Sequence, residues 1–173
     1  MSEVDLQTGQ PVSAGRLFDG VAALVRFTTG LALVSLVLLV CAEIVSRSFF
    51  SYSLKVMEEL AGYLVVGLTL FGASLSLRSN SLFQVGFVLH ALPAALQRVL
   101  NLLFQLISLG VCAVLIWQTG KLVLSSYARG NVAPTTLMTP LWIPQLLVPL
   151  GLSMIAIFII EQLIVTLRTK RAE

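Results

Sequence analysis

The sequence predicts an all-α integral membrane protein with four transmembrane helices. Of its 173 residues, 57% are hydrophobic and 11% are charged, whereas a soluble domain carries about 25% charged residues. The apolar residues gather in four stretches that are long enough to cross a bilayer as helices. The connections between these stretches are short, so we expect residues 16–173 to form a single membrane domain. The predicted spans cover about 27–46, 60–77, 97–119 and 143–167.

Residues 1–15 are polar and carry no basic residue, which predicts a disordered cytoplasmic tail and excludes a cleaved signal peptide. The first span is dense in Leu and Val. Glu43 lies near its far end, and Arg47 follows four residues later, so both side chains share one helix face. We interpret these residues as an ion pair, with a proton relay through Glu43 as the alternative. A short linker, 47–57, should follow.

The second span opens with Glu58 and Glu59 and ends at Arg78. Small residues along it, including Gly72 and Ser76, let another helix approach closely, either in this chain or in a partner. Because the two glutamates are adjacent, they point about 100° apart on a helix and cannot face each other as an acid/base pair. They either complement the helix dipole or contact a basic partner surface.

A short apolar segment, 82–92, separates the second and third spans and is too short to cross a membrane. We expect it to form a helix on the membrane surface, or a re-entrant segment. Pro93 is suited to the first position of the third helix, which would run to about Ser126 and would therefore tilt or protrude. His90 is the only histidine of the chain, which excludes a paired-histidine metal site.

Polar residues recur along the third helix at steps of three or four, which places them on one face. Unpaired amides in hydrocarbon are unfavourable, so this face should meet protein or water. A helix–helix seam is the main interpretation, within this chain or with a partner, and a polar pathway is the alternative. The face comprises Gln97, Asn101, Gln105, Ser108 and Cys112.

The connection to the fourth span, 121–142, contains the turn-forming pair Gly130-Asn131. Trp142 is expected at the membrane interface, where aromatic residues concentrate. The fourth span should begin at Ile143-Pro144, and Pro149, together with the glycine two residues later, should loosen its first turns. Glu161 lies in its last third.

Basic residues predict the orientation of the spans. Seven of the eleven lie on the side of the N-terminus and four on the other side, which is a modest positive-inside bias. Both termini are therefore expected in the cytoplasm, with Glu58, Glu59 and the 121–142 connection on the outer face. The inner residues are Arg16, Arg26, Arg78, Arg98, Arg168, Lys170 and Arg171, and the outer ones are Arg47, Lys55, Lys121 and Arg129.

Residue patterns for catalysis or cofactor binding are missing from the sequence. It contains no phosphate-binding glycine loop, no paired histidines and no nucleophile with a plausible base. The basic residues sit at helix ends and form no patch, which excludes nucleic acid as a partner. We therefore expect neither an enzyme nor a metal or cofactor site, and membrane lipids as the surroundings.

An ordered set of short motifs resembles one membrane-protein family. The second span begins EELA at Glu58 and contains FGAS at 71–74, followed by Arg78 and LFQV; ALPAALQRVLNLL and TPLWIPQLLVPLGLSMI come later. In this order, with four spans in about 170 residues, the chain resembles the small membrane subunit of tripartite ATP-independent periplasmic (TRAP) transporters, the DctQ-like family. One departure is that Leu82-Phe83 stand where the family often carries a histidine.

The resemblance implies an accessory scaffold subunit in a bacterial inner membrane. Its partners would be a large elevator-type membrane subunit, which carries an organic acid with sodium, and a periplasmic binding protein that delivers the substrate. On this view Glu58 and Glu59 lie near the docking site of the binding protein. The other candidate partner or packing residues are Gly72, Ser76, Arg78, Asn101, Gln105, Trp142, Pro144 and Pro149.

A different class of function is a self-sufficient four-helix exporter or pore that acts as a homo-oligomer. Such a protein needs an ionisable residue along its path, and Glu161 is the best candidate for it.

Overall fold

Four long helices make up most of the described chain. The computed structural model describes residues 15–50, 55–79, 94–133 and 138–169. Its helices are α1 (Arg16–Phe50), α2 (Lys55–Arg78), α4 (Ala94–Arg129) and α5 (Trp142–Thr169). All four are long and apolar enough to cross a membrane, which confirms the predicted all-α membrane fold. The predicted tail before Gly15 and the predicted surface helix at 82–92 lie outside the described residues.

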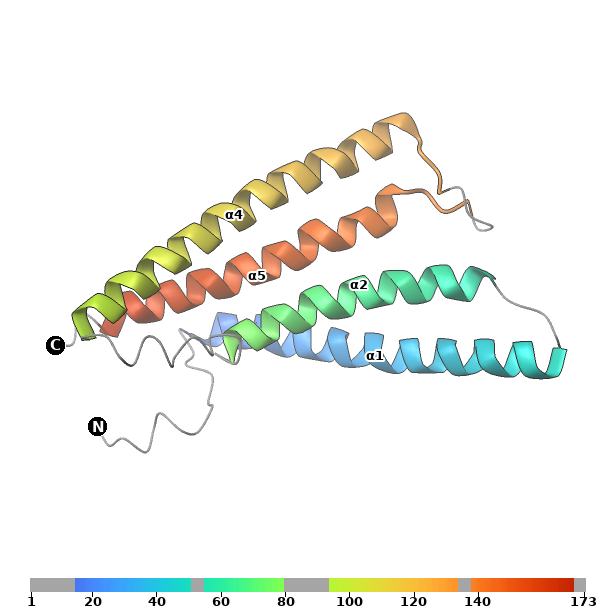
Figure 1. Ribbon diagram of the computed structural model, residues 1–173, viewed down its shortest axis with the longest axis horizontal. Coiled ribbons are helices and arrows are strands. Elements are labelled where there is room, and N and C mark those ends of the chain that lie inside the picture. The colour runs from blue at the N-terminus through green and yellow to red at the C-terminus, as the bar shows by residue number, and fades with distance from the viewer. Residues whose placement is uncertain (1–14, 51–54, 80–93, 134–137, 170–173) are drawn as a thin grey trace.

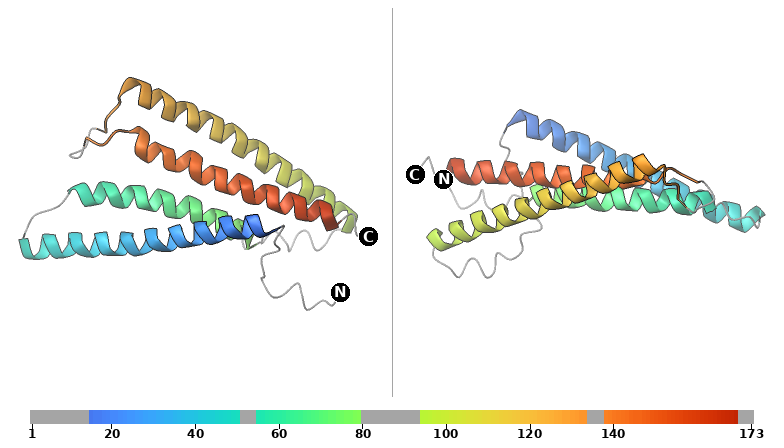
Figure 2. Two further views of the ribbon diagram at one scale, coloured as in Figure 1. Left: turned by 180° about the vertical axis from the view of Figure 1, so that it is seen from behind. Right: turned by 90° about the horizontal axis from the view of Figure 1, so that it is seen from above.

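The helices lie side by side in the order α1, α2, α5, α4 (Figure 1). Each packs mainly against its neighbour in this row, so α2 and α5 are central and α1 and α4 are at the edges. We call the end where α1 begins and α5 ends the terminal end, and the other the opposite end. Seen from above, α1 and α4 lean to opposite sides of α5 at the terminal end (Figure 2). The arrangement is one twisted layer of helices.

The first helix is longer than the predicted span, and the expected linker at 47–57 is wrong for most of its length. Helix α1 continues to Phe50, and α2 already begins at Lys55. Neither Gly nor Pro occurs between these helices to interrupt them. With 35 and 36 residues, α1 and α4 measure about 52 and 54 Å at 1.5 Å per residue. Both exceed a hydrocarbon core of about 30 Å and must tilt or protrude.

Gly130 ends α4 with a positive φ of 61°. The Asn131 amide donates to the Ser126 carbonyl, and the Gly130 amide donates to the Tyr127 carbonyl, both at 3.2 Å. This pair of bonds is the Schellman motif, which favours glycine because a side chain disfavours the left-handed conformation. The predicted turn at Gly130-Asn131 is thereby explained.

The two central helices are in close contact at Gly151 of α5. A Cβ atom placed there would lie 2.5 Å from the Cβ of Leu70 in α2, so only glycine fits without a shift. Pro149 lies inside α5 without ending it. The helix runs unbroken from Trp142 through both residues, although Pro149 has no amide to donate to the preceding turn, and Gly151 serves close packing.

Buried apolar residues are few and gather toward the terminal end. The core consists of Ala22, Leu77, Cys112, Phe158 and Ile159. In the most apolar 18-residue windows, none of the α1 residues and 17% of the α2 and α5 residues are buried. A layer one helix thick leaves both faces uncovered, so its apolar side chains are suited to lipid or to a partner.

Candidate functional site

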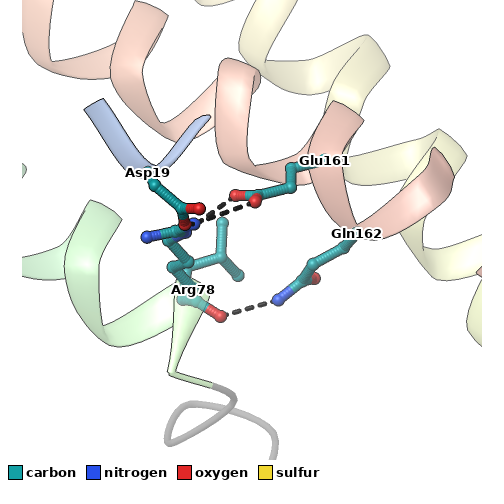
Figure 3. A network of polar contacts seen from close by, with 5 residues as sticks. Asp19, Arg78, Glu161 and Gln162 are labelled. Carbon is teal, nitrogen blue, oxygen red and sulfur yellow. Dashed lines mark hydrogen bonds and ion pairs between the residues drawn. The ribbon is translucent and has the colours of Figure 1, made fainter. Parts of the chain in front are cut away.

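A cluster of three charged residues joins three helices at the terminal end. Arg78 occupies the last turn of α2, and Asp19 the first turn of α1. Each position suits the charge, since anions are favoured at helix N-termini and cations at C-termini. Arg78 donates from Nε to Oε2 of Glu161 at 2.9 Å and from Nη2 to Oε1 at 3.1 Å. Its Nη2 also donates to Asp19 (Figure 3).

The cluster is buried on one side and open on the other. The side chains of Arg78 and Glu161 are 7% and 2% exposed, whereas that of Asp19 is 52% exposed. The guanidinium carbon lies 5.7 Å from the ring centre of the fully buried Phe158. The planar guanidinium group binds both oxygens of Glu161, which is the geometry that best offsets the loss of hydration.

A neighbouring amide strengthens the same joint. Gln162 Nε2 donates to the Leu77 carbonyl at 2.6 Å, so it satisfies an acceptor in the last turn of α2 (Figure 3). Two successive residues of α5 thus bind two successive residues of α2. Since removal of one member of a buried pair leaves an uncompensated charge, this cluster fixes the positions of α1, α2 and α5 relative to one another.

A second polar cluster fastens the α4–α5 connection at the opposite end. Glu59 accepts hydrogen bonds from the hydroxyls of Tyr63 and Thr139. The same two hydroxyls lie 3.4 Å apart. Thr139 belongs to a strand-like part of the connection, where the Ala133 amide donates to its carbonyl at 2.9 Å. The cluster therefore holds the connection against the start of α2.

Glu58 points toward α1, away from the partners of Glu59, as expected for adjacent residues that point about 100° apart on a helix. One of its oxygens lies 3.8 Å from Nη2 of Arg47 in α1, and both side chains are about two-thirds exposed. Arg47 thus has a partner on α2 in Glu58. The expected ion pair of Arg47 with Glu43, on the same helix, stays a prediction. The two adjacent glutamates consequently brace different neighbours and do not form an acid/base pair.

Aromatic residues mark the opposite end. Trp142, the first residue of α5, packs edge-on against Tyr127, with ring centres 5.7 Å apart. The Lys121 ammonium lies 5.0 Å from the ring centre of Trp117. Amphipathic rings beside a cation are typical of a membrane–water interface. The predicted interfacial position of Trp142 agrees with this arrangement.

The other predicted packing residues have different surroundings. A Cβ atom on Gly72 would meet nothing within 4 Å, so Gly72 faces open space beside α2. Gln105 lines a groove between α4 and its neighbours. Ser76, Asn101 and Pro144 are partly buried. Of the predicted packing residues, Arg78 joins the charge cluster and Gln105 lines this mainly apolar groove.

Sequence reasoning did not identify three members of these clusters. Asp19 lies eight residues before the predicted start of the first span, and Tyr63 and Thr139 carry no motif. One signal was available for Asp19 and Glu161, because alternating spans place both at the same membrane side as Arg78. In the described residues, no three His, Cys, Asp or Glu side chains gather as a metal would require.

Four membrane-length helices in one layer, with charges paired at their ends, define a multi-pass membrane protein. A family model, "Tripartite ATP-independent periplasmic transporters, DctQ component", matches residues 36–169. This match covers most of the chain and includes the whole of α2, α4 and α5. The chain belongs to the DctQ family of TRAP transporter small membrane subunits. A search of curated proteins finds no match.

Proposed function

We propose that the chain is the fixed scaffold on which a large membrane subunit moves. In this proposal the large subunit takes up an organic acid with sodium, and a periplasmic binding protein delivers that substrate. The protein would lie in a bacterial inner membrane with both termini in the cytoplasm.

The single-layer arrangement is the observation that supports this role best. A row of four helices exposes apolar side chains on both faces, so one face can bind a partner while the other contacts lipid. The charge cluster at one end and the Glu59 cluster at the other hold the layer in one shape. A single helix layer held in one shape is better suited to a scaffold subunit than to a subunit that moves with the substrate.

The surroundings of Glu161 favour the scaffold over a proton-coupled exporter. The carboxylate is paired with Arg78 through both oxygens and is almost fully buried. A proton carrier needs a carboxylate that can exchange protons with either side of the membrane. The pairing instead suits a joint between α2 and α5.

In this proposal the binding protein contacts the predicted outer face. Glu59 is engaged by Tyr63 and Thr139, whereas the side chain of Glu58 is 64% exposed. We therefore expect Glu58 and the α4–α5 connection to provide the docking surface, with Glu59 holding the connection in place.

The test is purification of the tagged chain from native membranes in mild detergent, followed by mass spectrometry. The proposal expects a second membrane protein of about a dozen spans to co-purify. Replacing Gly72 by Leu, at a site that faces open space, should lower the yield of that protein. Recovery of the chain alone, as a homo-oligomer, would contradict the scaffold role and direct attention to export through Glu161.

A further inference from the structure

A groove lies between α4 and α5 and reaches the end of α2. Its volume is about 350 Å³. Gln105 and Ser108, which belong to the polar face predicted for α4, line this groove. The polar face of α4 therefore contacts the neighbouring helices only in part. The lining includes Leu77, Gln105, Ser108, Cys112, Ile159 and Gln162.

Gln105 carries a hydrogen-bond acceptor that the described chain leaves unsatisfied. Its Oε1 atom is buried and has no hydrogen-bond partner among the described residues. On the other side of the groove, Gln162 uses its Nε2 to bind the Leu77 carbonyl. An amide oxygen without a donor is unfavourable in hydrocarbon. Gln105 lines the groove, and because the last torsion of a glutamine is broad, its amide can turn this oxygen toward an occupant.

The chemistry of the groove limits what can fill it. A lipid chain has no donor and would leave the Gln105 oxygen unsatisfied. Gln105 lies eleven residues after Ala94, about 16 Å along α4, next to the exposed apolar residues Leu106 and Ile107. None of the described residues that line the groove is charged, which disfavours a Lys or Arg side chain as occupant. A neutral donor on an apolar segment fits best.

We infer that this groove receives a membrane helix of the large subunit, and that Gln105 accepts a hydrogen bond from a neutral side chain of that helix, such as Ser, Thr or Asn. Small hydroxyl and amide side chains are the groups that hydrogen-bond between helices in membranes. The inference rests on the proposed function, because the groove is assigned as a contact site for the large subunit of that proposal. The helix seam predicted for α4 is then shared between this chain and its partner.

Gln105→Leu tests the inference because it removes the acceptor at nearly constant size. In the complex, we expect it to weaken binding of the large subunit about five- to thirtyfold, as for one interhelical hydrogen bond. In the isolated chain, the same change removes an unsatisfied acceptor and should leave thermal stability unchanged or raise it. Gln118→Leu is the matched control, since Gln118 is exposed on the same helix and lies outside the groove lining.

A second variant tests the groove without removing the amide. Ser108→Phe fills the space and should also release the large subunit, while Gln118→Phe should not. The inference is overturned if Gln105→Leu and Ser108→Phe both bind the large subunit like the wild type. It is also overturned if Gln105→Leu destabilises the isolated chain, because the amide then acts within this chain. If the wild type retains no large subunit, the proposed function fails, and the inference fails with it.

Discussion

Neutralising Glu161 should separate the two central helices at the terminal end. In the wild type, Arg78 makes two hydrogen bonds to Glu161 and one to Asp19, and its side chain is 7% exposed. Glu161→Gln removes the buried negative charge and keeps the shape of the side chain. The guanidinium group is then left with Asp19 alone, whose side chain is half exposed to solvent.

The expected loss follows from the burial of the pair. Removing one partner of a buried ion pair costs about 3–5 kcal/mol when the remaining charge has no other partner. Asp19 stays bound to Arg78 but is half exposed to solvent, so it compensates the buried charge only in part and the loss is expected toward the lower end of this range. At about 1.4 kcal/mol per factor of ten, this lowers the folding equilibrium constant by roughly 150- to 5,000-fold. The measurement is the free energy of unfolding in mixed micelles, titrated with a denaturing detergent.

A matched control comes from the opposite end of the layer. Arg47→Ala breaks the Arg47–Glu58 contact, in which both side chains are about two-thirds exposed. Exposed pairs contribute about 1 kcal/mol or less, so this variant should unfold almost like the wild type. The comparison separates the effect of burial from the effect of losing an ion pair.

The double variant Arg78→Leu with Glu161→Leu provides a sharper test. If the charges stabilise mainly by compensating each other, their joint removal costs less than either single change. Asp19 is exposed enough to be hydrated without its partner. The reasoning is refuted if Glu161→Gln unfolds like the wild type, or if the two single losses simply add in the double variant.

Two further substitutions test the packing of the layer. Gly151→Ala should destabilise the isolated chain by about 1–3 kcal/mol, because the new methyl group meets Leu70, whereas Gly72→Ala should be neutral there. Thermal unfolding of both variants checks this, and restoration of stability by adding Leu70→Ala is expected; equal melting temperatures for the two glycine variants would contradict it. Glu59→Gln should loosen the α4–α5 connection without unfolding the helices, because it weakens the bonds from Tyr63 and Thr139. Hydrogen exchange at 138–141 should then accelerate while exchange in α5 stays slow, and unchanged exchange in the connection would exclude the proposed anchor.

The fold class was accessible from the sequence because membrane insertion depends on local composition. Four long, mainly apolar stretches must form helices in lipid, where each backbone group needs a partner within its own segment. The same logic located Trp142 near an interface and separated Glu58 from Glu59 on the helix surface. It could not fix helix ends, since α1 extends to Phe50 through residues that neither require nor prevent a helix.

The sequence alone thus determined the four spans and their alternating directions. Only the tertiary structure decided which of their residues meet. The order α1, α2, α5, α4 brings Arg78 to Glu161, 83 positions later in the chain, and places Gly151, not Gly72, against a neighbouring helix. Helix order and rotation depend on packing between distant segments, and the composition of each span carries little information about them.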